Sequence, residues 1–174
     1  GVLALLGESS FAENIGHTSP NHHLSSLFKK LIAKTDGRII FSVLPVHLYT
    51  IEGIFNAAKN SHRKVVVMGK KLQNIINMAI KENYINIEEG QIGDLSNVND
   101  HNSILLISDD RSNAYNMFER IIAGNDKFIK LNEHDTVCFA EPKYDENEKA
   151  FVKVENELAM NGINTVSIPK DKGI

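Results

Sequence analysis

Residues Arg38–Gly69 read RIIFSVLPVHLYTIEGIFNAAKNSHRKVVVMG, and this stretch decides the fold class. It begins and ends with short apolar runs that are nearly continuous rather than alternating, as is typical of strands covered on both faces. Between them, apolar residues from Leu48 to Ala58 recur at helical spacing and predict a helix over 47–60. The stretch therefore predicts a strand, a helix and a second, parallel strand.

The same alternation continues along the rest of the chain. Further strands are predicted over 2–7, 103–108, 136–140 and 164–168, and further helices over 24–33, 72–83, 113–123 and 147–161. Residues 85–102 are predicted to form a loop with at most one short strand, and Gly162 stands where a helix C-terminal cap belongs. Strict alternation predicts an α/β fold: a doubly wound, mostly parallel, Rossmann-like sheet with helices on both faces.

Length and composition indicate one globular domain. The 174 residues are 42% apolar and 24% charged, which is ordinary for such a domain. The single cysteine, Cys138, excludes a disulfide framework and a cysteine-based zinc site, and indicates a reducing, cytoplasmic location. No apolar run approaches the ~20 residues of a membrane span. Because the chain begins with Gly1 rather than Met, we expect an excised piece or a processed product.

The net charge of −3 hides an uneven distribution. Residues 1–27 carry a net −2, residues 28–82 carry ten basic and three acidic residues, and residues 83–174 carry nine basic and seventeen acidic residues. This distribution argues against a uniformly basic nucleic-acid-binding protein. A basic stretch within an acidic body is still compatible with a local anion site.

Several motifs of known active sites are missing. No Gly-x-Gly-x-x-Gly follows a strand, no Gly-x-Ser-x-Gly is present, and Gly69-Lys70-Lys71 lacks the other residues of a P-loop. A His-x-His-x-Asp-His cluster is also absent, so the chain by itself carries no complete active site. In open α/β sheets ligands bind outside the carboxyl ends of the strands. The turns there are 7–10, 44–47, 69–71, 108–112 and 141–147.

Several blocks of the sequence, taken in order, resemble one known family. Residues Leu5–Glu13 read LLGESSFAE and resemble the Leu-Leu-Ser-Asp-Ser-Thr-Asn-Ala-Glu segment of ribonuclease J, a metallo-β-lactamase-fold RNase with an inserted β-CASP domain. Gly37–Phe41 resembles its Gly-Arg-Ile-Ile-Val strand, Asp135–Val137 its Gly-Asp-Thr-Val, and Asn147–Ala150 its Gly-Asn-Glu-Lys-Ala-Val. The resemblance covers nearly the whole chain.

The resemblance implies a domain assignment and a function. Residues 1–174 would be a single β-CASP domain fragment, with residues 1–10 as the last strand of the preceding metallo-β-lactamase part. The parent protein would be a zinc-dependent ribonuclease with 5′-3′ exonuclease and endonuclease activity, bound to single-stranded RNA and assembled with itself or a paralogue. Its zinc-binding histidines lie upstream of such a piece, so we expect the fragment to be inactive and to hold no cofactor.

The family's metal-bridging aspartate falls on Glu8. The additional methylene displaces the carboxylate, while metal–ligand distances vary by only about 0.2 Å. Glu8 is therefore a weak candidate metal ligand, and its alternative role is a polar residue after a buried strand. Ser9 and Ser10 follow it and are, by the same resemblance, candidate RNA contacts.

The family's 5′-monophosphate turn, Thr-Gly-Ser-Gln-Gly-Glu-Pro, falls on residues Ser108–Ala114. Phosphate cradles use glycine so that backbone N–H groups can approach the anion. Both glycines are gone here, and Asp109 and Asp110 would repel a phosphate, which predicts an impaired pocket. Arg111 and Ser112 remain candidate phosphate contacts, and the two aspartates are alternatively a cap for the following helix.

The family's RNA-channel segment, Thr-Phe-Ala-Ser-Asn-Val-His-Arg, falls on Val43–Thr50. Its polar Ser, Asn, His and Arg become Val46, His47, Tyr49 and Thr50, which leaves His47 as the candidate RNA contact.

The family's Gly-Arg-Ser turn falls on Gly69-Lys70-Lys71 and keeps its positive charge. Lys70 and Lys71 are therefore the best remaining phosphate contacts, or alternatively a solvated helix start.

This pattern of departures resembles the diverged, weakly active second paralogue found in Firmicutes. The sequence predicts an RNA-clamping β-CASP domain of a ribonuclease J-type RNA-degradation protein. Two alternatives remain open: a free-standing α/β domain that binds a small anion or nucleotide, and a non-catalytic interaction module.

Overall fold

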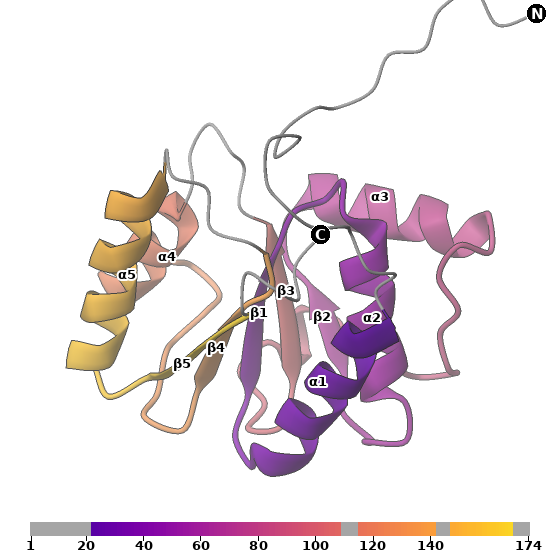
Figure 1. The fold of residues 1–174 in the computed structure, drawn as a ribbon, viewed down its shortest axis with the longest axis horizontal. Helices are drawn as coiled ribbons and strands as arrows, with labels where there is room; N and C mark the ends of the chain where they lie inside the picture. The colour runs from indigo at the N-terminus through magenta and orange to yellow at the C-terminus, as the bar shows by residue number, and fades with distance from the viewer. Residues whose placement is uncertain (1–21, 109–114, 142–146, 169–174) are drawn as a thin grey trace, which may run out of the picture.

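Parallel strands form the centre of the fold in the computed structural model of the chain, which describes residues 22–108, 115–141 and 147–168 (Figure 1). The strands are β1 (Ile39–Val43), β2 (Val65–Val67), β3 (Ile104–Ser108), β4 (Thr136–Phe139) and β5 (Asn164–Ser167). The helices are α1 (His22–Lys34), α2 (Leu48–Ala58), α3 (Lys70–Lys81), α4 (Asn116–Ile122) and α5 (Glu148–Met160), with a 3-10 helix over Leu95–Asn97. The predicted alternation is confirmed in this part of the chain. The strand predicted over 2–7 lies outside the described residues.

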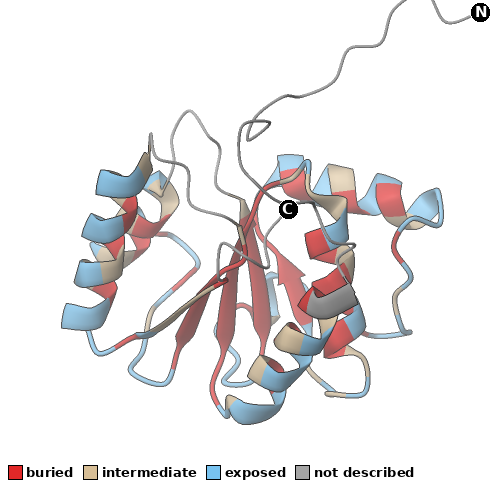
Figure 2. Ribbon diagram, in the orientation of Figure 1, coloured by how far each residue is buried: buried red, intermediate tan, exposed pale blue. Residues whose placement is uncertain are grey.

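The sheet order is β2-β3-β1-β4-β5, and every neighbouring pair is parallel. β1 lies at the centre, where Ile40 is opposite Leu105 of β3 and Val137 of β4. All five residues of β1 are buried, which explains its continuous apolar run (Figure 2). Only the edge strand β5 is partly exposed along its length.

Two hydrophobic cores lie on opposite faces of this sheet. On one face, Phe28 of α1 and Phe55 of α2 pack with Phe41, and α3 adds its own apolar side. On the other face, Phe151 of α5 packs on Phe139 with 4.8 Å between ring centroids, and α4 contributes to the same core. The doubly wound α/β architecture with helices on both faces is therefore confirmed.

The structure also refines the predicted loop and cap. The loop over 85–102 contains the 3-10 helix and one isolated bridge between Val65 and Ile92, so the short strand expected there is a single bridge. Gly162 has a φ of 74°, and the Ile163 N–H donates to the Leu158 carbonyl at 3.0 Å. This is the expected C-terminal cap, in a left-handed conformation that glycine adopts without strain.

Two of the ribonuclease J-like blocks meet where β1 and β4 begin. Buried Arg38 donates from Nε and Nη2 to buried Asp135 at 2.9 and 2.5 Å, and its other nitrogen reaches the Val98 carbonyl. A Cβ on Gly37 would stand 2.0 Å from the carbonyl oxygen of His134, so only glycine fits there. These contacts hold the amino ends of β1 and β4 together.

Candidate functional site

The carboxyl ends of all the described strands lie on one side of the molecule, the upper side in Figure 1. After β1 the chain turns into α2 on one face, and the helix α5 that follows β4 covers the other face. Because β1 and β4 are neighbours, this is a topological switch point, the position where open α/β sheets bind ligands.

The residues that follow β1 and β4 are joined at this switch point by one carboxylate. Oε1 of Glu141 accepts the Leu44 N–H at 3.1 Å, and Oε2 contacts Nδ1 of His47. The His47 N–H donates to the Leu44 carbonyl at 3.0 Å, which closes a turn with Pro45 at its second position. Both side chains of this contact are largely buried, with 17% of His47 and 11% of Glu141 exposed. Glu141 thus fixes the β1–α2 turn against the end of β4.

The side chains next to His47 are exposed and carry no charge. Val46 is 74% exposed and Tyr49 is 72% exposed, whereas Thr50 is buried. Of the four positions where this chain departs from the family's polar channel segment, two therefore present apolar or aromatic surface, and Thr50 is excluded from ligand contact.

Lys70 and Lys71 lie at the same carboxyl ends of the strands, which we call the carboxyl edge, and they follow β2. α3 begins directly at Lys70, two residues before its predicted start, and Gly69 precedes it with a φ of 90°. Both lysines are exposed, and the first turn of α3 contains no acidic residue. Cations are unfavourable at a helix N-terminus, so an anion bound there would offset both the lysines and the helix dipole. The structure therefore confirms the helix start at Lys70. The phosphate contact at the two lysines stays a prediction.

The predicted phosphate turn starts at Ser108, where β3 ends, between His47 after β1 and the two lysines after β2. β3 separates β2 from β1, so at usual strand spacing the ends of β1 and β2 are roughly 10 Å apart. Ser108 ends β3 and is partly exposed. The remaining candidates lie outside the described residues, and they are Glu8, Ser9, Ser10, Asp109, Asp110, Arg111 and Ser112. Of the predicted site residues, the structure therefore describes His47, Lys70 and Lys71, and all three lie at the carboxyl ends of the strands.

Glu141 is the residue that sequence reasoning missed. It lies in one of the five turns expected to face a ligand, but it is 94 residues away from His47, and no pattern links the two.

Among the described residues, no group of three or more His, Cys, Asp or Glu side chains could hold a metal ion. This part of the chain therefore does not fit a zinc centre. None of the helices described in the structure is both long and apolar enough to cross a membrane.

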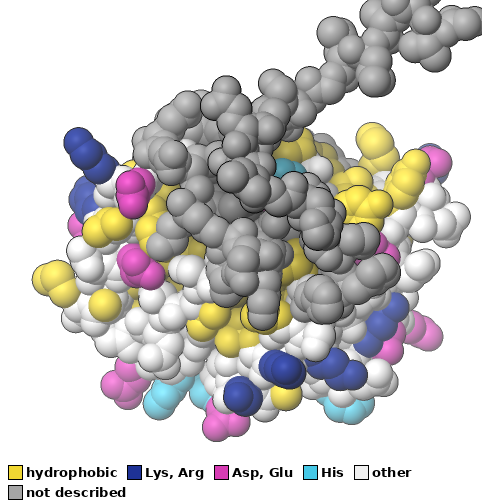
Figure 3. Space-filling view, in the orientation of Figure 1, with side chains coloured by type: hydrophobic (Ala, Val, Ile, Leu, Met, Phe, Trp, Pro, Cys, Tyr) yellow, Lys and Arg dark blue, Asp and Glu magenta, His cyan; other side chains and the backbone are white. Residues whose placement is uncertain are grey.

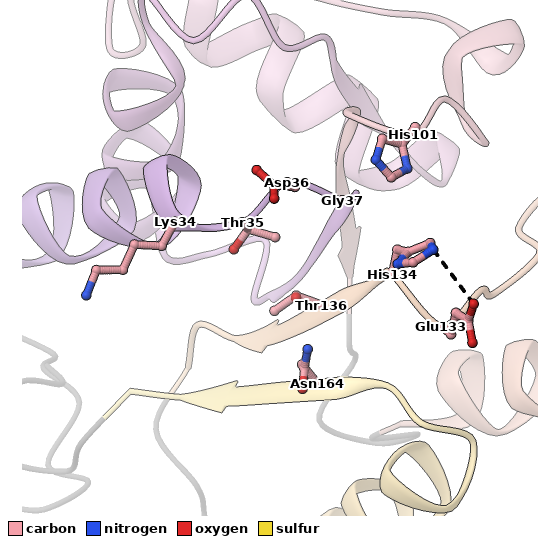
Figure 4. A pocket seen from close by; sticks show the side chains of 9 residues that line it. All are labelled: Lys34, Thr35, Asp36, Gly37, His101, Glu133, His134, Thr136 and Asn164. Carbon is pink, nitrogen blue, oxygen red and sulfur yellow. Dashed lines mark ion pairs between the residues drawn. The ribbon is translucent and has the colours of Figure 1, made fainter.

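A pocket of about 510 Å³ lies on the opposite side, near the amino ends of β1, β4 and β5 (Figure 4). It is lined by Lys34, Thr35, Asp36, Gly37, His101, Glu133, His134, Thr136 and Asn164. The His101 and His134 rings are 5.9 Å apart, and His134 Nε2 faces Glu133 Oε1 at 3.7 Å. Its mixed charges and its position at the amino ends of the strands make it a weaker candidate than the switch point.

Comparison with known proteins gives the family. The profile of "Ribonuclease J, beta-CASP domain" matches residues 36–158. The chain belongs to this family. The chain is 26% identical over 166 residues to ribonuclease J 2 of Streptococcus pyogenes serotype M3, covering 93% of this chain and 30% of that protein. It is 27% identical over 169 residues to ribonuclease J of Synechocystis, covering 95% of this chain and 26% of that protein.

The β-CASP chain spans about 30% of the length of the curated relatives that it matches. Ribonuclease J 1 of the same Streptococcus is 25% identical over 95% of this chain. Sequence identity alone therefore does not decide whether the chain is more similar to ribonuclease J 1 or to ribonuclease J 2. The match to the family confirms the β-CASP fold that the ordered sequence blocks predicted.

Proposed function

We propose that this chain is the RNA-clamping β-CASP domain of a cytoplasmic, ribonuclease J-type RNA-degradation protein. The observation that carries the proposal is the pair of exposed lysines, Lys70 and Lys71, at the carboxyl edge of a sheet of this family. Lysine binds phosphate as a point charge, which suits the backbone of single-stranded RNA. His47, beside the switch point, is the polar contact on the other side of β3.

We further propose that the 5′-monophosphate pocket is impaired. The turn that would cradle the phosphate carries Asp109 and Asp110, and Glu141 adds a carboxylate at the same edge. Like charges near a phosphate oppose its binding, while Arg111 and Ser112 offset this in part. RNAs with a 5′-monophosphate and a 5′-hydroxyl should therefore bind the full-length protein equally well. A marked preference for the monophosphate would contradict the impaired pocket.

Catalysis is proposed for the parent protein and not for this piece. Residues 1–10 would be the end of the preceding metallo-β-lactamase part, and Glu8 its contribution to a zinc site held mainly by residues outside the chain. Zinc would supply a polarised water for phosphodiester hydrolysis in that parent. The proposed partners are single-stranded RNA and a second ribonuclease J chain, either identical or paralogous.

The test is RNA binding as a function of salt. For single strands, the logarithm of the affinity falls with the logarithm of salt concentration by about 0.7 per phosphate contact. Replacing Lys70 and Lys71 with alanine should reduce that slope by about 1.4 and weaken binding at low salt. The matched control replaces Lys29 and Lys30, two adjacent exposed lysines of α1. Equal effects of both double variants would contradict the proposed site, as would RNA binding that does not depend on salt.

A further inference from the structure

We propose that Tyr49, with Val46 beside it, is a stacking platform for an unpaired RNA base at the carboxyl edge of the sheet. The proposal rests on the RNA-binding function proposed above and deepens it. It names the chemical group, a nucleobase face, that this edge recognises in addition to phosphate.

The first support is the exposure of an aromatic ring at the ligand-binding edge. Tyr49 lies in the first turn of α2, directly after the turn that Glu141 fixes, and almost three quarters of its surface is in water. Val46, three residues before Tyr49, is 74% exposed and is a second apolar side chain of the same turn. Every nucleobase has an apolar face, so an exposed tyrosine ring can stack on any unpaired base.

The second support is the set of hydrogen bonds that hold the backbone beneath these side chains. Glu141 holds both the Leu44 N–H and the His47 ring, and the Ile51 N–H donates to the His47 carbonyl at 3.3 Å. Thr50 and Ile51, which follow Tyr49, are buried. A base that stacks on Tyr49 therefore meets a fixed backbone, which reduces the entropy lost on binding.

The third support is the positive charge at the same edge. Lys70 and Lys71 follow β2, which is separated from β1 by a single strand. A cationic groove combined with an aromatic ring is the usual arrangement for binding single-stranded nucleic acid without sequence preference. A protein partner would instead require a broader apolar surface, and the polar side chains of His47 after β1 and Glu141 after β4 interrupt it.

The direct experiment replaces Tyr49 with tryptophan, because the wild-type chain contains no tryptophan and the new ring is then the sole indole signal. The Tyr49→Trp protein is titrated with a single-stranded adenosine oligoribonucleotide, a duplex RNA of equal length, and inorganic polyphosphate. Stacking predicts quenching of the tryptophan fluorescence by the single strand alone, since paired bases cannot splay onto the ring and polyphosphate has no bases. The matched reporter is Tyr84→Trp, because Tyr84 lies beyond the far end of α3 and is 68% exposed. Its fluorescence should not change.

Affinity measurements complete the test. Tyr49→Ala should weaken binding of the single strand about tenfold, Tyr49→Phe should leave it unchanged, and Tyr84→Ala should have no effect. If wild-type protein binds RNA with the expected salt dependence but Tyr49→Trp is not quenched and Tyr49→Ala has no effect, stacking is overturned and the proposed function stands. If no variant and no wild-type protein binds RNA, the proposed function itself fails. A Tyr49→Trp emission that shifts with protein concentration alone would assign the surface to self-association and overturn the stacking proposal.

Discussion

Arg38 and Asp135 are two charged residues that lie entirely inside the protein, where β1 and β4 begin. Asp135→Ala should destabilise the fold by about 3–5 kcal/mol, because the buried guanidinium then lacks its counter-charge. Urea unfolding measures this change. The matched control is Glu119→Ala, which breaks the exposed 2.7 Å pair with Lys153 and should change stability little. Equal effects of the two variants would contradict a structural role for the buried pair.

Asp126 gives the fold a pH dependence at the acidic end. Burial alone would raise the pKa of its carboxyl, but the N–H groups of Ile129 and Phe128 and the Arg120 guanidinium donate to it and lower the pKa below its ordinary value. A carboxyl whose pKa is lower in the folded state adds stability above its unfolded pKa of about 4. That stability is lost as the pH falls through the folded pKa.

Asp126→Asn should therefore lose stability near neutral pH and flatten the decline in stability below about pH 4. Urea unfolding at a series of pH values measures both effects. A variant whose stability falls with pH as steeply as that of the wild type would exclude Asp126 as the source.

At the scale of elements, Glu141 connects β4 to the turn between β1 and α2. Glu141→Ala leaves the Leu44 N–H without its acceptor and should destabilise the protein by about 1–3 kcal/mol. Glu141→Gln keeps an oxygen at that position and should cost less than about 1 kcal/mol. Thermal or urea unfolding separates the two variants. If Gln and Ala are equally destabilising, the charge and not the hydrogen bond is what fixes the turn.

The strands and helices could be predicted from the sequence because their signals are local. β1 is buried on both faces and therefore appears as a continuous apolar run, and α2 buries one side and therefore shows helical spacing. The start of α3 was predicted two residues late, since Lys70 and Lys71 lie in its exposed first turn and add nothing to the apolar pattern.

The candidate site was predictable only in part. The turns at His47 and Gly69–Lys71 follow from the rule that ligands bind at the carboxyl ends of strands, and the structure places both there. The contact between His47 and Glu141 could not be predicted, because it depends on β1 and β4 being neighbours despite the 94 residues between the two side chains. The exposure of Tyr49, in contrast, agrees with the sequence pattern, because Tyr49 is not among the apolar residues at helical spacing that α2 buries.

At the scale of the whole molecule, the basic stretch over 28–82 does not form one continuous RNA-facing surface. Arg38 is buried, and Arg63 donates to the carbonyls of Thr35 and Gly37 near the amino ends of the strands. Figure 3 shows Lys, Arg and His side chains, interspersed with Asp and Glu, along the lower margin of this face, where the strands begin. Part of the positive charge is therefore structural, while Lys70 and Lys71 stand at the carboxyl edge.

The measurement that tests the account most directly is photocrosslinking of the protein to single-stranded RNA containing 4-thiouridine, followed by peptide mapping. The two sides of the sheet provide the contrast: the carboxyl edge carries Tyr49, Lys70 and Lys71, and the amino side carries the pocket with His101 and His134. We predict crosslinks to residues 44–50 and 69–73, lost on competition with unlabelled RNA. Crosslinks confined to residues 34–37, 101 and 133–136 would contradict the assignment of the carboxyl edge as the RNA-binding surface.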